Sequence, residues 1–293
     1  MVIFIQQLCN GLALGLVYAL VAVGYSLVFG ILRLINFSHG AVYAFGAHAA
    51  FFFVGIHLGP IPAIILAVIV TGFLGVVIDK IALAPLRKKK SVSIAALVTT
   101  LGISNIIQNM LVVLFGSQRK PFPDFFNLGP LNLGGIQLNS RQFVMFGVCL
   151  GLLLFLLIIV QKTKIGLAMR ATAQNAKAAS LMGINVNSII TLTFLMGGAS
   201  AAIAGGMVSG YYQVVYPGMG FMIGLKAFAA SVLGGIGSLP GALVGGLAVG
   251  VIESIAALYI GSNYRDAMAF IILIAVLIVR PSGIFGKPEV VKV

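Results

Sequence analysis

The sequence predicts an all-α integral membrane protein with about eight membrane segments. Its residues are 60% hydrophobic and only 8% charged, and its mean hydropathy is +1.15, far outside the range of water-soluble domains. Apolar runs of roughly 20 residues recur along the whole chain, each long enough to cross a hydrocarbon core of about 30 Å as a helix. These runs are apolar on every face, whereas the strands of a membrane β-barrel alternate apolar and polar residues. We therefore expect a single transmembrane domain over residues 1–293.

The predicted segments cover nearly the whole chain. They lie at 6–32, 37–57, 61–84, 94–115, 142–160, 189–212, 224–260 and 266–280. The first charged residue is Arg33, so the first segment lacks the basic start of a signal peptide and is expected to remain as a span. Glycine pairs at helical spacing, such as Gly11 with Gly15 and Gly246 with Gly250, predict close helix packing.

The segment at 224–260 is too long for one span and is broken by GGIGSLPGALVGG. Several glycines and a proline cannot all lie comfortably in one helix interior. We expect either two half-length helices that enter and leave on the outer side, or two short crossings. The predicted helix breaks are at Gly40, Gly234, Gly235, Gly237, Pro240 and Gly241.

The net charge of +13 comes from 18 basic and five acidic residues. The cations cluster in short loops between segments, which is typical of cytoplasmic loops and not of nucleic-acid binding. The clusters are Arg87, Lys88, Lys89 and Lys90; Lys162, Lys164, Arg170 and Lys177; and Arg280, Lys287 and Lys292. Residues 116–141 are then an external loop, 161–188 are cytoplasmic, and an even number of crossings must separate 161–188 from the tail.

The stretch INFSHGAVYAFG (35–46) places Asn36, Ser38 and His39 in an otherwise apolar region. SHGAVYAFG (38–46) resembles SLPGALVGG (238–246), since both have a serine ahead of Gly-Ala at a helix start. Transporters often carry paired helix interruptions at their binding region. We therefore predict a substrate pathway lined by Asn36, Ser38, His39 and Ser238, although His39 equally fits a structural role.

Acidic residues within apolar segments are few. Glu253 is the one carboxylate deep in such a segment and is predicted as a pathway group, with a structural role near the external helix end as the alternative. Asp79 with Lys80, and Asp266 with Arg265, are expected to be ordinary boundary residues.

Enzymatic chemistry and cofactors are not expected. His39, His48 and His57 are spaced by nine residues, which points neighbours to opposite helix faces and does not form a metal site. The chain lacks a Walker phosphate loop and a nucleophile elbow. We predict no catalytic, metal or cofactor site.

The cytoplasmic stretch NAKAASLMG (175–183) reads as a short helix that begins at Asn175 and stops at Gly183. A compact helix in a basic loop between two spans is suited to docking a cytosolic partner.

Five stretches carry a family resemblance: QQLCNGLALGLVYALVAVGYSLVFG, INFSHGAVY, RATAQNAKAASLMGIN, GFMIGLKAFAASVLGGIGSLPGALVGG and RPSGIFGKPEVVKV. The sequence resembles, from end to end, the LivH-type permease subunit of bacterial ATP-binding-cassette (ABC) importers for branched-chain amino acids. This implies an ABC-importer permease fold in the bacterial inner membrane. The implied coupling residues, which contact the ATPase, are Asn175, Ala179, Gly183, Ile184 and Asn185.

The resemblance also implies partners. They are two cytosolic ATP-binding subunits that hydrolyse the ATP, a second related permease and a periplasmic substrate-binding protein. The alternatives are a permease of the same type for other amino acids, urea or short amides; a stand-alone secondary transporter; and, least favoured by the polar breaks, a membrane scaffold.

Overall fold

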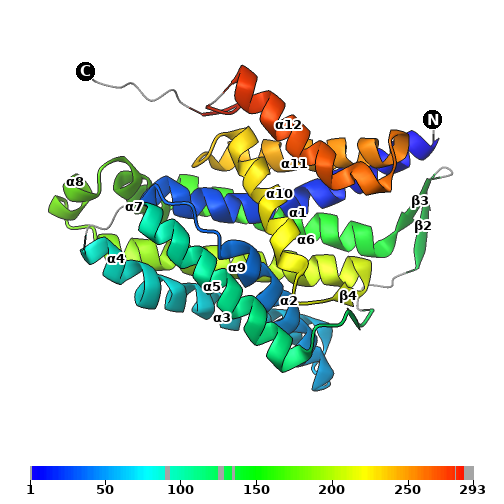
Figure 1. The fold of residues 1–293 in the computed structure, drawn as a ribbon, viewed down its shortest axis with the longest axis horizontal. Coiled ribbons are helices and arrows are strands. Elements are labelled where there is room, and N and C mark those ends of the chain that lie inside the picture. The colour runs from blue at the N-terminus through cyan, green and yellow to red at the C-terminus, as the bar shows by residue number, and fades with distance from the viewer. Residues whose placement is uncertain (1, 90–92, 125–128, 134–135, 281, 287–293) are drawn as a thin grey trace.

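The computed structural model describes residues 2–89, 93–124, 129–133, 136–280 and 282–286. Predictions for Lys90, Lys287 and Lys292, and for parts of the external loop at 125–128 and 134–135, lie outside the described residues. The chain forms a bundle of helices with two small pairs of strands at one end (Figure 1).

Helices provide almost all of the described structure. They are α1 (Val2–Leu32), α2 (His39–Gly55), α3 (Pro60–Val77), the π-helix η1 (Ile78–Leu83), α4 (Ala84–Lys88), α5 (Ser93–Phe115), α6 (Ser140–Lys162), α7 (Lys164–Gln174), α8 (Ala176–Leu181), α9 (Val186–Tyr212), α10 (Met219–Gly234), α11 (Leu239–Tyr259), the 3₁₀-helix η2 (Ser262–Tyr264) and α12 (Arg265–Val279). Strand β1 (Lys120–Pro121) pairs with β4 (Val214–Val215), and β2 (Pro130–Leu133) pairs with β3 (Ile136–Asn139), both antiparallel.

Within the described residues, seven helices are long and apolar enough to cross a membrane. Two more are shorter: α2 has 17 residues and α10 has 16, so each spans about 24–26 Å at 1.5 Å per residue. The prediction of an all-α membrane protein with interrupted helices is confirmed. Both short helices lie beside an interruption.

The two ends of the bundle differ in charge and structure. Helices α4, α7 and α8 lie at one end, and β2 and β3 lie at the other (Figure 1). The first end carries the basic residues at 87–89 and 162–177, so these two cation clusters share one side, as the sequence predicts. We take this end as cytoplasmic and the strand end as external.

The long segment at 224–260 forms α10 and α11, joined by a turn at 235–238. Gly235 and Gly237 have φ of +102° and +87°, a region that favours glycine. The turn lies at the cytoplasmic end, because Gly237 packs against Gly30 near the inner end of α1. The tail also reaches it, since the Ile284 amide donates to the Leu233 carbonyl at 2.9 Å.

Helix α10 therefore runs from the external β4 to the cytoplasmic end, and α11 returns. A turn at the cytoplasmic end agrees with two short crossings rather than with half-length helices that enter and leave on the outer side, and α10, with 16 residues, is shorter than the seven candidate spans. The tail supplies hydrogen bonds at this turn, since the Ile284 and Phe285 amides donate to the Leu233 and Gly234 carbonyls, and the inner end of α1 packs against it through Gly30. Helices α9, α10, α11 and α12 then give an even number of crossings between residues 161–188 and the tail, as is required if the cations of both lie in the cytoplasm.

The centre of the bundle is α1, whose middle is buried from Leu14 to Val28. Its most extensive partner is α11. The two helices meet backbone to backbone: a Cβ built on Gly246 would collide with the backbone of Ala19, and one on Gly250 with that of Gly15. Such close approach is how helices associate in lipid, where packing replaces the hydrophobic effect.

We predict that Gly246→Ala destabilises the protein by about 1–3 kcal/mol, because the added methyl group overpacks a contact made of backbone atoms. The measurement is thermal unfolding in detergent. Gly147→Ala on α6 is the matched control, since a Cβ there meets no atom within 4 Å. Equal melting temperatures for the two variants would contradict the proposed close contact.

Candidate functional site

The break between α1 and α2 is held together by its own polar residues. The Asn36 side-chain oxygen accepts hydrogen bonds from the Ser38 amide at 3.2 Å and the Ser38 hydroxyl at 2.6 Å. The Asn36 carbonyl accepts from the His39 amide at 3.3 Å. All three residues are buried. Their hydrogen bonds define the start of α2 within the protein interior.

His39 fills a gap between α1 and α9. A Cβ on Gly24 of α1 would collide with the imidazole, and a Cβ on Gly197 of α9 would lie 3.6 Å from it. The ring also meets Tyr25 edge-on, with centroids 4.9 Å apart. These contacts agree with the structural role that the sequence left open for His39.

Gly40 provides a close approach rather than a turn. It is the second residue of α2, and a Cβ there would lie 2.5 Å from the Gly220 carbonyl oxygen and 3.1 Å from the Gly224 Cα of α10. Helices α2 and α10 therefore cross at contact distance. A cleft of about 30 Å³, lined by Phe37 and by Ser104 of α5, lies beside this crossing. The cleft is far smaller than the roughly 300–1,000 Å³ of a usual small-molecule site.

The second interruption lies next to the first. The Ser238 hydroxyl accepts from the Gly241 amide at 3.2 Å and begins α11, with Pro240 in its first turn. Gly234 and Gly241 touch through their backbones on either side of the turn. Asn36 and Ile236 line one small cavity, so the two breaks share a wall. The structure thus brings together the two stretches that the internal resemblance paired.

Glu253 lies in a separate place, in a buried ionic cluster at the external end. Its carboxylate is 2.9 Å from the Lys226 ammonium of α10 and 3.1 Å from the Arg265 guanidinium of α12. Lys226 also contacts Asp266 at 2.6 Å and lies 5.6 Å from the Tyr18 ring centroid. Two cations and two carboxylates therefore join α1, α10, α11 and α12.

Two sequence expectations need correction. Asp79 is not an ordinary boundary residue but is completely buried, with its oxygens 2.6 Å from Arg87 and 2.7 Å from the donating Thr191 hydroxyl. This joins η1 and α4 to α9. Arg265 and Asp266 likewise belong to the ionic cluster. A sequence places a charge at a segment end, but only packing decides whether that end is covered.

The middle of α5 carries polar side chains that sequence analysis missed. Ser104, Asn105, Gln108 and Asn109 follow one another at helical spacing in the centre of this span. Asn105 and Asn109 are exposed on the surface of the chain, and the side-chain amide of Asn109 donates to the backbone carbonyl of Asn105 at 2.8 Å. The available signal was the run SNIIQN inside an apolar segment. Polar groups at this depth normally face a neighbouring helix or a water-filled cavity.

The break at 33–38 is connected to the same helix. The Phe37 amide donates to the Thr100 hydroxyl of α5 at 3.2 Å. Ser104, one helical turn further along α5, lines the cleft at the crossing of α2 and α10. The α5 polar residues therefore begin next to the crossing of α2 and α10 and continue toward the external end.

The cytoplasmic coupling region forms the short helix that the sequence predicts. The Asn175 side chain accepts from the Ala178 amide at 3.0 Å and begins α8, and Gly183 ends the turn with φ of +85°. The Asn185 side chain accepts from the Ser188 amide at 3.1 Å and begins α9. Ala179 is the buried residue of α8, and the Ile184 amide donates to its carbonyl at 3.0 Å.

Comparison with known proteins agrees with this architecture. Residues 7–277 match the family described as the permease component of the branched-chain amino acid transport system. The chain belongs to this permease family. It is therefore a transport component and a multi-pass protein of the inner membrane.

Curated relatives align over nearly the whole chain. BraD, a permease of the high-affinity branched-chain amino acid transport system of Pseudomonas aeruginosa, is 40% identical over 99% of this chain and 98% of its own. LivH of Escherichia coli is 39% identical with the same coverage. A probable branched-chain amino acid permease of Methanocaldococcus jannaschii is 32% identical over 91% of this chain and 88% of its own.

A solved structure shares the fold. A chain of PsaBC from Streptococcus pneumoniae, determined in complex with a Fab, superposes with a TM-score of 0.53 at 15% identity, covering 94% of this permease and 92% of that chain. The predicted permease fold is confirmed. The substrate-pathway roles of Asn36, Ser38, His39, Ser238 and Glu253, and the coupling roles of the α8 region, stay predictions.

We predict that Glu253→Gln lowers the free energy of unfolding by about 3–5 kcal/mol, because the buried Lys226 loses a partner. Replacing both residues, Lys226→Met with Glu253→Met, is expected to recover part of this loss because the two buried charges are removed together and the charges left without partners, Arg265 and Asp266, are partly exposed. Thermal unfolding in detergent measures both. A Glu253→Gln variant of normal stability that has lost transport would instead assign Glu253 to the pathway.

Proposed function

We propose that this permease carries branched-chain amino acids, namely leucine, isoleucine and valine, across the bacterial inner membrane as one subunit of an ATP-driven importer. The observation that carries the proposal is the full-length similarity to permeases of high-affinity branched-chain amino acid transport systems. The proposed partners are two cytosolic ATP-binding subunits, a second related permease and a periplasmic substrate-binding protein.

The α8 region supports a docking role for the cytosolic ATP-binding subunit. Leu181 and Met182 are 89% and 83% exposed at the end of α8, although both are apolar. The side chains of Asn175 and Asn185 fix the helix starts on either side of them. A rigid helix that presents two apolar side chains beyond the membrane end fits a groove on a partner. Movement of that partner would be transmitted to α9, which begins four residues after Met182.

The α5 polar residues support a pathway between this chain and the second permease. Asn105 and Asn109 offer amide groups for the ammonium and carboxylate of an amino acid, and exposed Leu101 and Ile106 on the same helix offer contact to an aliphatic side chain. The oxygens of Asn36 and Ser238 are engaged in holding the two helix starts. In this proposal they fix the shape of the breaks that border the pathway, and α5 contacts the substrate.

Reconstitution in proteoliposomes tests the function. With both ATP-binding subunits, the second permease and the binding protein, ATP-dependent uptake of radiolabelled leucine is expected, and uptake should stop without ATP. Uptake by this chain alone, driven by an ion gradient, would contradict the proposal and indicate a secondary transporter. Uptake of urea or short amides in preference to leucine would keep the importer and change its cargo.

We predict that Leu181→Ser combined with Met182→Ser weakens co-purification of the ATP-binding subunits at least tenfold, because two apolar side chains lose their buried area in the complex. The matched control is Ile165→Ser with Leu167→Ser on α7, a second exposed apolar pair at the same end of the molecule. The control should retain the ATP-binding subunits. Equal retention by both variants would exclude α8 as the docking element.

We predict that Asn105→Leu and Asn109→Leu each reduce leucine uptake about tenfold, because a hydrogen bond to a charged substrate group is lost. Val113→Leu, on the same helix and 84% exposed, is the control and should transport normally. Size-exclusion chromatography verifies that each variant assembles. Normal uptake by both asparagine variants would remove α5 from the pathway.

A further inference from the structure

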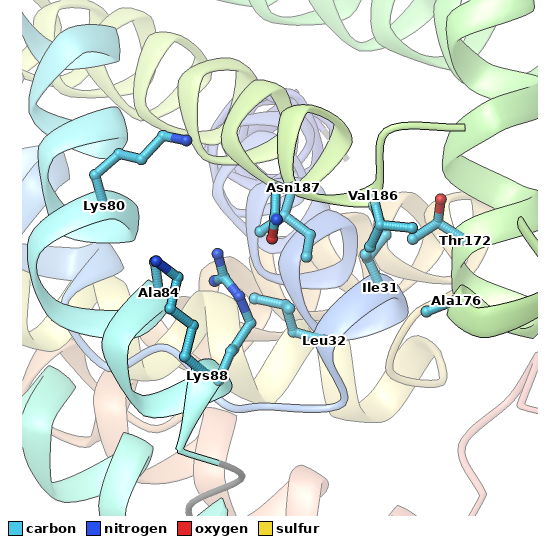
Figure 2. A pocket seen from close by; sticks show the side chains of 11 residues that line it. Ile31, Leu32, Lys80, Ala84, Lys88, Thr172, Ala176, Val186 and Asn187 are labelled. Carbon is cyan, nitrogen blue, oxygen red and sulfur yellow. The ribbon is translucent and has the colours of Figure 1, made fainter. Parts of the chain in front are cut away.

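A third and larger cavity lies at the cytoplasmic end, away from the crossing of α2 and α10. Its volume is about 530 Å³, within the range of about 300–1,000 Å³ that is usual for small-molecule sites. Lys80 and Lys88 lie on one wall, and Val186, Asn187 and Thr172 lie on the other (Figure 2). The inner end of α1 closes it with Ile31 and Leu32. The cavity therefore has basic residues on one wall and a largely apolar lining elsewhere.

The basic wall contains three cations: Lys80, Arg87 and Lys88. Arg87 is bound to Asp79, whose second oxygen is occupied by the Thr191 hydroxyl. Among the described residues, neither lysine forms an ion pair with a carboxylate. Two ammonium groups therefore line this cavity without a counter-charge from the described chain.

The chain has few acids to provide one. Of its five acidic residues, Asp124 pairs with Arg141, and Glu253 and Asp266 belong to the external ionic cluster. Asp79 is engaged with Arg87, and Glu289 lies outside the described residues. An anion bound by Lys80 and Lys88 in this cavity is thus expected to come from another molecule.

The surroundings identify the class of anion. Exposed apolar side chains run along α3 and η1 toward the cavity, with Ile69 59%, Phe73 64% and Ile81 73% exposed, and Ile81 is adjacent to Lys80. These side chains do not line the cavity itself, but the surface they form is apolar enough to lie against the acyl chains of the inner leaflet. An acyl chain lying against it places its head group at the two lysines, where cations near the leaflet surface attract anionic lipid.

We propose that this cavity is a binding site for the phosphate head group of an anionic phospholipid of the cytoplasmic leaflet. Lys80 and Lys88 bind the phosphate, and the apolar lining accommodates the glycerol and the first acyl carbons. The opposite wall contains Ala176, the first residue of α8, and Val186, the first residue of α9. A bound lipid therefore links η1 and α4, which carry Lys80 and Lys88, to the segment that presents Leu181 and Met182.

The test measures lipid binding by the assembled permease complex. The complex is placed in nanodiscs of phosphatidylcholine with a fluorescent phosphatidylglycerol as the probe, and binding is followed by energy transfer from a label at the cytoplasmic end. Lys80→Gln with Lys88→Gln is the test variant, and Lys162→Gln with Lys164→Gln is the control with equal charge removed at the same end. Arg87 is left intact because its salt bridge to Asp79 belongs to the fold.

The test variant is expected to lose affinity for phosphatidylglycerol by about fivefold per charge, and so roughly 25-fold in total, while the control binds like the wild type. Equal binding by the two variants overturns the proposal. The proposal is also overturned if inorganic phosphate abolishes the energy transfer and the complex shows no preference for phosphatidylglycerol over phosphatidylcholine, since that result assigns the cavity to a free anion. Loss of the binding when the ATP-binding subunits are removed also overturns it, since the cavity would then belong to a protein interface. These outcomes are independent of which substrate the importer carries.

Discussion

Hydrocarbon offers no hydrogen-bond partners, and this constraint governs where the permease can interrupt its helices. Each break at membrane depth must satisfy its own backbone groups. At the interior break at 33–38 the chain does so with a short side chain, since Asn36 accepts from the Ser38 amide and hydroxyl. At the cytoplasmic turn, Ser238 accepts from the Gly241 amide in the same way. The polar residues that look out of place in an apolar sequence are therefore what makes the interruptions possible.

Glycine then brings the interrupted helices into contact. Gly40 meets Gly220 and Gly224 at the crossing of α2 and α10, and Gly246 and Gly250 let α11 touch α1. Because lipid is as apolar as a leucine side chain, close packing of this kind is the main source of helix association. The two breaks are consequently fixed beside each other, and the polar residues of α5 begin next to them. The proposed pathway depends on this arrangement more than on any single polar group.

Scarce acidic residues organise both ends of the molecule. At the external end, Glu253 and Asp266 balance Lys226 and Arg265 and tie four helices together. At the cytoplasmic end, Asp79 alone joins η1 and α4 to α9 through Arg87 and Thr191. The chain has only five acidic residues, and those of its described part are engaged in ion pairs. Most cytoplasmic cations of the described residues therefore have no carboxylate partner within the chain. The counter-charges for this excess of positive charge must therefore come from other molecules.

The sequence by itself determined the class of the molecule, its orientation, the break at 235–238 and the short cytoplasmic helix that begins at Asn175. These follow from hydropathy, from the side on which cations collect and from the local chemistry of glycine, proline and asparagine, all of which act over a few residues. Tertiary structure alone decided that α10 and α11 turn at the cytoplasmic end, that Asp79 and Glu253 are buried in ion pairs, and that Asn105 and Asn109 are exposed at mid-membrane. Each of these depends on which distant helix covers a residue, and a periodic apolar sequence does not record that choice, because its helix faces are chemically alike.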